Sequence, residues 1–189
     1  MSNLKSSKPK LILIGASTGG PGHIQKILEN LESDFDSTVI IAQHMGEAYL
    51  PSFAKSLNNK CMLDVCMAED GMVLKSSKVY VCSGLCTLRE NLEFSTQTTD
   101  TRHFNPDINT LFESAVEVVD KFKVMSVILT GIGEDGAKGS LLLSNAGARC
   151  LAESEQSAIV FGMPKRTIEL CKNSEVKSID EIVEDVRNF

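Results

Sequence analysis

A glycine-flanked serine is the first residue of the chain whose surroundings suit chemistry. Residues 15–19, Gly-Ala-Ser-Thr-Gly, fit the Gly-x-Ser-x-Gly pattern, in which the glycines allow a sharp strand-to-helix turn and leave the serine hydroxyl exposed. A helix after such a turn points free N–H groups and its positive dipole end toward the serine, as an oxyanion hole requires. Glycine and serine are also common turn residues, so this loop alone leaves Ser17 as a nucleophile, part of a phosphate cradle or a turn residue.

Two further loops supply the partners that a serine nucleophile needs. His44 lies where an apolar run meets a loop, a position that suits either a structural histidine or a general base. A serine–histidine pair requires a third group that holds the imidazole tautomer and stabilises the imidazolium. Asp135, in a loop after another apolar run, is the best-placed candidate for that group. Ser17, His44 and Asp135 therefore form a candidate triad, and their order along the chain matters little because a triad is defined by geometry.

The third loop also supports a different class of protein. Residues 131–136, Gly-Ile-Gly-Glu-Asp-Gly, match the Gly-x-Gly-x-x-Gly fingerprint of dinucleotide-binding domains, and Glu153 follows at a suitable distance to bind a ribose hydroxyl. Glu134 and Asp135 argue against it, because two carboxylates beside a pyrophosphate cost on the order of a few kcal/mol. An NAD-binding Rossmann-type domain that uses Gly131–Gly136 stays as an alternative, and a non-catalytic binding module on the same fold is a third.

The apolar pattern predicts the elements that hold these loops. Short β-branched runs at 10–15, 38–43, 124–130 and 148–153 indicate strands buried on both faces, and stretches of helical period lie between them. This alternation predicts an α/β fold, a mostly parallel, doubly wound sheet with helices on both faces. In such a sheet, loops at the carboxyl ends of the strands gather at one edge.

Particular segments refine this prediction. A helix is expected from Pro106, which would lie in its first turn, with apolar residues spaced three and four apart as far as Phe122. Residues 72–82 and 87–94 indicate hairpins that form an antiparallel excursion at one edge of the sheet. Ser178, with Glu181 three residues later, predicts a capping box at the start of a final helix.

Length and charge narrow the class of protein. The 189 residues, 42% of them apolar, suit one compact domain over residues 10–189 after a polar segment at 1–9. The formal net charge of −6 disfavours a nucleic-acid surface, which needs clustered lysines and arginines. The apolar run at 11–14 is too short for a signal peptide or a membrane span. We therefore expect a cytoplasmic protein without membrane insertion. We also expect it to be a monomer.

The cysteines favour buried thiols over a metal site. No pair has the Cys-x-x-Cys spacing, and a chain of this size needs no disulfide staples. A zinc site would have to combine Cys61 and Cys66 with Cys82 and Cys86 on two flexible turns, and we expect no metal. The six cysteines are Cys61, Cys66, Cys82, Cys86, Cys150 and Cys171.

Several ordered motifs together resemble one known family. They include IGASTGGPGHIQKIL, AQHM, PDINTLFESA, VILTGIGEDGAKG and VFGMP. In order and spacing they closely resemble the catalytic domain of the bacterial chemotaxis protein-glutamate methylesterases, over residues 10–188. The resemblance implies a parallel α/β sheet with an antiparallel hairpin, and it assigns the family's serine, histidine and aspartate to Ser17, His44 and Asp135.

The resemblance also implies a reaction without a cofactor. The family hydrolyses γ-glutamyl methyl esters on the cytoplasmic helices of chemoreceptors, and many members also deamidate glutamines. Around the nucleophile, Thr18, Gly19 and Ile132 are the candidates to stabilise the oxyanion through backbone N–H groups. Ile132 replaces the family's usual methionine, which is tolerable if that residue contributes its backbone alone. Pro106-Asp107-Ile108-Asn109 departs from the usual Pro-Ser-Val-Asp, so this chain has an amide where the family usually has that last carboxylate.

Substrate docking and regulation are the remaining expectations. Receptor methylation regions are often acidic, as this chain is, so we expect a local docking patch that includes Arg102 and either Arg89 or Arg166, with ordinary solvated charges as the alternative. Family members commonly carry a phosphorylatable receiver domain ahead of the catalytic domain, and the resemblance does not extend to one. If the chain works alone, we expect activity that a small phosphodonor such as acetyl phosphate does not change.

Overall fold

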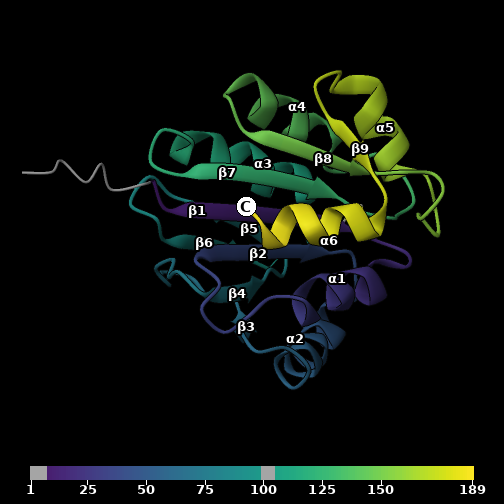
Figure 1. The fold of residues 1–189 in the computed structure, drawn as a ribbon. Helices are drawn as coiled ribbons and strands as arrows, with labels where there is room; N and C mark the ends of the chain where they lie inside the picture. The colour runs from purple at the N-terminus through teal and green to yellow at the C-terminus, as the bar shows by residue number, and fades with distance from the viewer. Residues whose placement is uncertain (1–7, 99–104) are drawn as a thin grey trace, which may run out of the picture.

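The fold is built on one parallel sheet. A computed structural model describes residues 8–98 and 105–189. Seven strands lie in the order β3-β4-β2-β1-β7-β8-β9, and neighbouring strands run parallel (Figure 1). Their bounds are β1 Lys10–Ala16, β2 Ser37–Gln43, β3 Asp64–Met67, β4 Lys78–Val81, β7 Lys123–Ile128, β8 Arg149–Glu153 and β9 Glu175–Lys177.

Helices cover both faces of this sheet because the central strands are apolar on both sides. In β1, Leu11 and Leu13 belong to one core cluster, whereas Ile12 and Ile14 belong to the other. Helices α1 (Gly20–Glu29), α2 (Leu50–Asn58) and α6 (Ile179–Arg187) pack on the Ile12 face, and α6 crosses the front of the sheet in Figure 1. Helices α3 (Ile108–Ala115), α4 (Ala137–Asn145) and α5 (Met163–Leu170) pack on the Leu11 face. The predicted doubly wound architecture is confirmed.

A hairpin forms a second, smaller sheet. Strands β5 (Leu85–Leu88) and β6 (Phe94–Gln97) pair antiparallel, as predicted for residues 87–94. They contact α3 on one face of the main sheet rather than extending its edge. Phe94 is fully buried there, with its ring centroid 5.0 Å from that of Tyr80 in β4.

The other predicted hairpin, over residues 72–82, is wrong. Its second half is β4, which lies inside the main sheet and pairs parallel with both β2 and β3. Val79, Tyr80 and Val81 are all fully buried, as is usual for an interior parallel strand. The polar residues 75–78 therefore lead into a buried strand and do not form the turn of a hairpin.

The predicted helix boundaries are partly right. α3 begins at Ile108, so Pro106 precedes it and does not lie in its first turn. The Asp107 side chain caps α3 by accepting a hydrogen bond from the Thr110 N–H at 2.8 Å. The helix gives way at residue 116 to a 3-10 turn (Val116–Val118), where β-branched valines lower helix propensity. The other 3-10 turn, Glu47–Tyr49, leads into α2. The capping box of Ser178 and Glu181 is confirmed at the start of α6.

The strand order places three loops at one edge of the sheet. β1 lies between β2 and β7, so the segments after Ala16, Gln43 and Ile128 leave adjacent parallel strands at their carboxyl ends. These segments contain the three loops that carry the candidate triad. Over residues 8–98 and 105–189, no helix is long and apolar enough to span a membrane.

The cysteines that could have formed a zinc site lie on different sides of the sheet. Cys61 packs against the Ile12 face, whereas Cys66, Cys82 and Cys86 pack on the opposite face. The Sγ atoms of Cys82 and Cys86 are 2.8 Å apart, and all six cysteines are free thiols. Within the described part of the chain, no group of three or more His, Cys, Asp or Glu residues could hold a metal ion.

Thiol labelling tests this core. Burial raises the pKa of the Cys150 thiol to about 11, so about one molecule in a thousand carries its thiolate at pH 8. Burial also raises the pKa of Cys82 well above its ordinary value. We expect iodoacetamide at pH 8 to label the half-buried Cys61 and Cys66 first, and to reach the four buried cysteines after denaturation. Mass spectrometry of native and unfolded protein measures this order, and rapid native labelling of Cys150 would contradict it.

Candidate active site

Asp135 and His44 form a hydrogen-bonded pair. The Nε2 atom of His44 lies 2.8 Å from Oδ2 of Asp135. The Asp135 side chain is 2% exposed and the His44 side chain 12%, so the pair is largely shielded from water. An ionised carboxylate can only accept hydrogen bonds, so Nε2 carries the hydrogen and the imidazole is held in one tautomer. The same carboxylate would stabilise an imidazolium, which a general base becomes when it takes a proton.

Two helix ends hold the Asp135 carboxylate. Its Oδ2 accepts a hydrogen bond from the Ile108 N–H, and its Oδ1 accepts from the N–H groups of Asn109 and Gly136, each at 2.9 Å. Ile108 and Asn109 begin α3, and Gly136 is the N-cap residue of α4. The positive ends of both helices therefore stabilise this negative charge, which fixes the carboxylate beside His44.

The same contacts count against a dinucleotide site at Gly131–Gly136. The Gly136 N–H, at the start of α4, is bonded to Asp135, in the place where a pyrophosphate would need such donors. Glu153, considered above for a ribose hydroxyl, is fully buried and bonded to groups of this chain. The Rossmann-type alternative is therefore not favoured.

Backbone hydrogen bonds bring Ser17 to the same edge as His44. The Ser17 N–H donates to the Thr130 carbonyl at 3.0 Å, and the His44 N–H donates to the Ala16 carbonyl at 2.8 Å. The Nε2 group of Gln43 then donates to the carbonyls of both Ser17 and His44, at 2.9 and 2.8 Å. The loops after β1, β2 and β7 are thus joined directly, and the three candidate triad residues lie on joined loops.

A glycine allows the third loop to approach the serine. A Cβ atom at Gly131 would lie 2.7 Å from Cβ of Ser17 and 3.1 Å from its backbone nitrogen. The same atom would lie 2.3 Å from Sδ of Met163 at the start of α5. Real Cβ atoms essentially never lie within 3.0 Å of a heavy atom in another part of the chain, so only glycine fits at position 131 against the present positions of Ser17 and Met163.

Among the described residues, three backbone N–H groups of the serine loop and the adjoining loop are unpaired. The N–H groups of Thr18, Gly19 and Ile132 find no acceptor among residues 8–98 and 105–189. Gly19 has a φ of 86°, in the left-handed region, and it ends the turn from which α1 begins. Ile132 is 62% exposed, so its side chain stands away from the core. These three N–H groups are therefore available as hydrogen-bond donors, and their role at an oxyanion stays a prediction.

Two polar residues of this site were not singled out from the sequence. Gln43 joins the serine and histidine loops, and Thr130 receives the serine N–H while its own hydroxyl donates to the Thr18 carbonyl at 2.9 Å. Both lie inside motifs that had been noticed, AQHM and VILTGIG. Their positions in the sequence, next to His44 and Gly131, could have identified them. A buried polar side chain beside a reactive loop usually forms a hydrogen bond with that loop.

Two of the three predicted docking arginines, Arg89 and Arg166, lie in the described part of the chain and at different elements. Arg166, on α5, is ion-paired with Glu134 at 3.2 Å and with Glu169 at 3.3 Å. Arg89 follows β5 and pairs with Asp70 at 3.1 Å. Arg102 lies outside the described residues. Arg166 is adjacent to the site, because it shares with Glu134 a groove whose other lining residues are Asn109, Ala137, Lys138, Leu141 and Leu170.

At residues 106–109, where the sequence departs from the family's usual Pro-Ser-Val-Asp, Asn109 connects two helices. Asn109 supplies its backbone N–H to Asp135, and its side-chain oxygen accepts from the Gly139 N–H of α4 at 2.9 Å. An amide therefore joins α3 to α4 at the position where the family usually has a carboxylate. The support that Asp135 receives from this segment comes from backbone groups, and so it does not depend on the side chain at 109.

Comparisons with known proteins agree with this geometry. The family model described as CheB methylesterase matches residues 12–186. A protein-glutamate methylesterase/protein-glutamine glutaminase 2 of Carboxydothermus hydrogenoformans is 38% identical over 96% of this chain and 55% of the relative, and a protein-glutamate methylesterase/protein-glutamine glutaminase of Paraburkholderia xenovorans is 39% identical over 93% and 50%. The Thermotoga maritima CheB methylesterase catalytic domain superposes with a TM-score of 0.87 at 31% identity, covering 97% of this chain and 98% of that one. The chain spans about half the length of the curated relatives it matches.

Substitution of Gly131 tests the contact between loop and serine. We expect Gly131→Ala to lower the rate at which a fluorophosphonate modifies Ser17 by up to about 100-fold, because the added methyl must displace the serine by about 1 Å. Gly22→Ala in α1 is the matched control, since a Cβ there meets nothing within 4 Å. The adduct is measured by mass spectrometry. Equal modification of the two variants would show that Gly131 does not constrain Ser17.

Proposed function

Since the chain belongs to the CheB methylesterase family, we propose that it hydrolyses the methyl esters of glutamate side chains in chemoreceptors and releases methanol. The observation that carries this proposal is the 2.8 Å contact between His44 and Asp135, on loops bonded directly to the Ser17 loop. The proposal concerns the described domain and the reaction that its own residues can perform.

Acylation begins at the serine. Ser17 Oγ attacks the ester carbonyl carbon, while the imidazole of His44 takes the hydroxyl proton on Nδ1, the ring nitrogen opposite the one that contacts Asp135. The bond to the methoxy oxygen then breaks, and His44 returns the proton to the departing methanol. The substrate's γ-carbonyl is left esterified to Ser17.

Deacylation repeats the proton transfers with water. His44 removes a proton from water as its oxygen attacks the acyl carbon, and then gives that proton to Ser17 Oγ when the acyl bond breaks. The products are a free glutamate side chain and the original serine. Both tetrahedral intermediates carry a negative oxygen, for which we assign the N–H groups of Thr18, Gly19 and Ile132 as donors. One such donor typically contributes about 3 kcal/mol to catalysis.

Glutamine deamidation follows the same course with a different leaving group. Ser17 attacks the amide carbonyl, His44 protonates the departing nitrogen, and ammonia leaves in place of methanol. The acyl-enzyme is identical, so hydrolysis again yields glutamate. The relatives named above are described as both methylesterase and glutaminase, which supports this second activity here.

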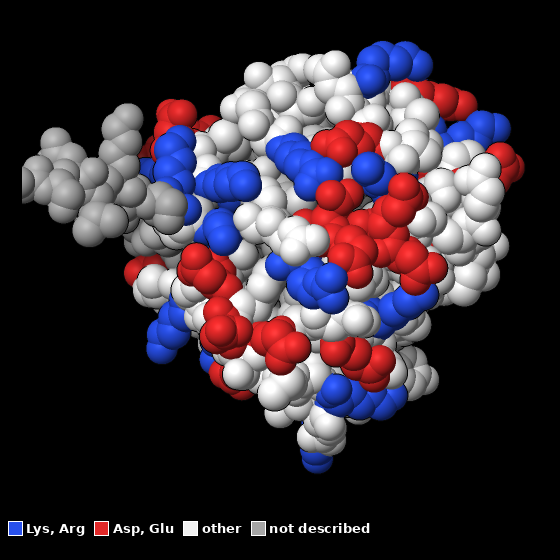
Figure 2. Space-filling model, in the orientation of Figure 1, with Lys and Arg blue, Asp and Glu red and all other residues white. Residues whose placement is uncertain are grey.

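The surface charge bears on how the substrate is recognised. On the face shown in Figure 2, acidic side chains gather over α6, and lysines and arginines are interspersed without forming a continuous basic area. We therefore propose that an acidic helical segment of a receptor docks away from α6, at the edge of the sheet where the triad lies. Arg166 is the predicted docking arginine that lies beside that edge.

Methanol release decides the proposed function. We expect wild-type protein to release methanol from methylated receptor fragments, and Ser17→Ala to lower kcat by about 10⁶-fold, because the members of a triad act as a unit. Ser76→Ala, an exposed serine between β3 and β4, is the matched control and should retain full activity. Methanol is measured by gas chromatography. Equal release by wild type and Ser17→Ala would refute the serine mechanism.

Charge reversal tests the docking residue. We expect Arg166→Glu to raise KM for receptor fragments about fivefold with kcat unchanged, since it places a third carboxylate beside Glu134 and Glu169 and repels an acidic substrate. Arg187→Glu, at the end of α6 on the opposite face of the sheet, is the control. Steady-state demethylation at low ionic strength gives both constants. An unchanged KM would remove Arg166 from the docking surface.

A further inference from the structure

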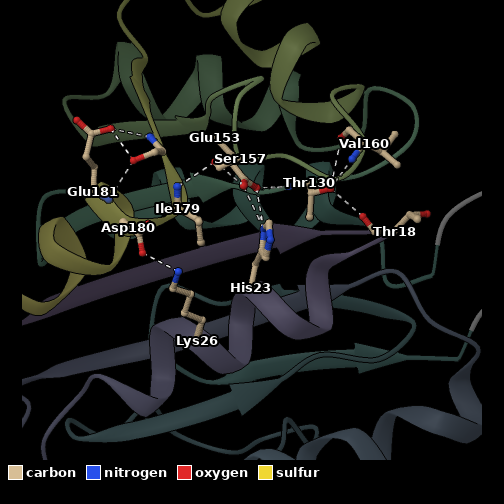
Figure 3. Close-up of polar contacts among 11 residues, drawn as sticks. Thr18, His23, Lys26, Thr130, Glu153, Ser157, Val160, Ile179, Asp180 and Glu181 are labelled. Atoms are coloured by element: carbon tan, nitrogen blue, oxygen red, sulfur yellow. Dashed lines mark hydrogen bonds and ion pairs between the residues drawn. The ribbon is translucent and has the colours of Figure 1, made fainter.

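A second histidine–carboxylate pair lies close to the nucleophile loop, residues 15–19 (Figure 3). His23, in α1, places Nδ1 3.1 Å from the carboxylate of Glu153, the last residue of β8. The Glu153 side chain is 0% exposed and the His23 side chain 14%. The pair is therefore as enclosed as His44 and Asp135, although none of its contacts involves a residue of the candidate triad.

The Glu153 carboxylate is surrounded by donors. Oε2 accepts a hydrogen bond from the Thr130 N–H at 2.8 Å, and Oε1 accepts from the Ser157 hydroxyl at 2.8 Å. A buried carboxylate is stable only when such donors, and preferably a positive partner, replace water. His23 supplies a further donor, because an ionised carboxylate can only accept and the contacting Nδ1 must then carry the hydrogen. The Lys26 ammonium, one turn further along α1, is paired with Asp180 at 2.6 Å.

Thr130 connects Glu153 to the backbone of the serine loop through hydrogen bonds. Its N–H is bonded to Glu153, its carbonyl accepts from the Ser17 N–H at 3.0 Å, and its hydroxyl donates to the Thr18 carbonyl at 2.9 Å. Thr130 thus bonds to the backbone of both Ser17 and Thr18. Figure 3 shows its bonds to Glu153 and to Thr18. A change in the position of the Glu153 carboxylate must therefore be transmitted to the nucleophile loop.

We propose that His23 is a positioning residue for Ser17, acting through Glu153 and Thr130. His23 connects α1, which begins immediately after the nucleophile loop, to Glu153 at the end of β8. The inference rests on the proposed function for its catalytic consequence, but the support that this side-chain contact gives to the loop can be measured without any activity. Without the Nδ1 donor, the Glu153 carboxylate loses one of its three donors and Thr130 loses a fixed acceptor.

The expected consequence falls on turnover and not on binding. A nucleophile displaced by about 1 Å can lose about 100-fold in rate, and a loosened loop loses part of that. We expect His23→Ala to lower kcat for methanol release about tenfold with KM unchanged. His23→Asn should return kcat to within about twofold of wild type, because the asparagine amide nitrogen replaces Nδ1 as a donor. Lys26→Ala, on the same helix, is the matched control and should behave as wild type.

A second measurement is independent of activity. Backbone amide hydrogen exchange, followed residue by residue by NMR, should show the N–H groups of Ser17 and Thr130 exchanging about tenfold faster in His23→Ala than in wild type or His23→Asn. Ser157→Ala removes a donor from the other side of Glu153, and should accelerate the same two amides. It serves as the second variant if His23→Ala does not fold.

The outcomes separate the two proposals. If wild type releases methanol and His23→Ala retains its kcat, or if the two amides exchange at the wild-type rate, the positioning role is overturned. A rise in KM at constant kcat, or a failure of His23→Asn to restore turnover, would also overturn it. If wild type releases no methanol, the proposed function fails, and amide exchange alone decides whether His23 holds the loop.

Discussion

A buried carboxylate must be surrounded by hydrogen-bond donors, and the architecture of the site follows from that requirement at Asp135. Its two oxygens accept four hydrogen bonds, from His44 and from three backbone N–H groups at the starts of α3 and α4. Helix α4 begins in the loop that leaves β7 at the carboxyl edge of the parallel sheet, whereas α3 follows the β5–β6 hairpin and packs against α4. The starts of the two helices thus meet at this edge and hold the carboxylate, and the carboxylate orients the imidazole.

Close approach of backbone to backbone is the second requirement. The loop after β7 can lie against Ser17 only because residue 131 has no side chain, and α1 can begin at once after the serine because Gly19 adopts a positive φ. The side chains of Gln43 and Thr130 then join the three loops through hydrogen bonds. Glycines thus allow the three loops to approach one another, and buried polar side chains keep them in place through hydrogen bonds.

The two histidine–carboxylate pairs of this domain illustrate a division of roles. Asp135 is bonded to the imidazole that we propose as general base, whereas Glu153 is bonded to the backbone that carries the proposed nucleophile. Both carboxylates are almost fully buried and held by several donors, and each follows or ends a strand next to the site. The same physical device can therefore orient a proton acceptor in one place and a polypeptide segment in another.

Local sequence pattern predicted the buried strands β1, β2, β7 and β8 and the capping box of α6. It also located the three loops that carry the candidate triad. These features could be predicted because strand, cap and turn signals lie in residues that are close together in the chain. Local pattern failed at residues 72–82, because a polar lead into a buried strand looks like a hairpin turn until the neighbouring strands are known. It likewise offered Glu153 as a ribose ligand, and did not connect it with His23, 130 residues away in the chain. Which carboxylate faces which histidine is decided by strand order and by the packing of helices on the sheet, and these are contacts between distant segments that no local pattern encodes.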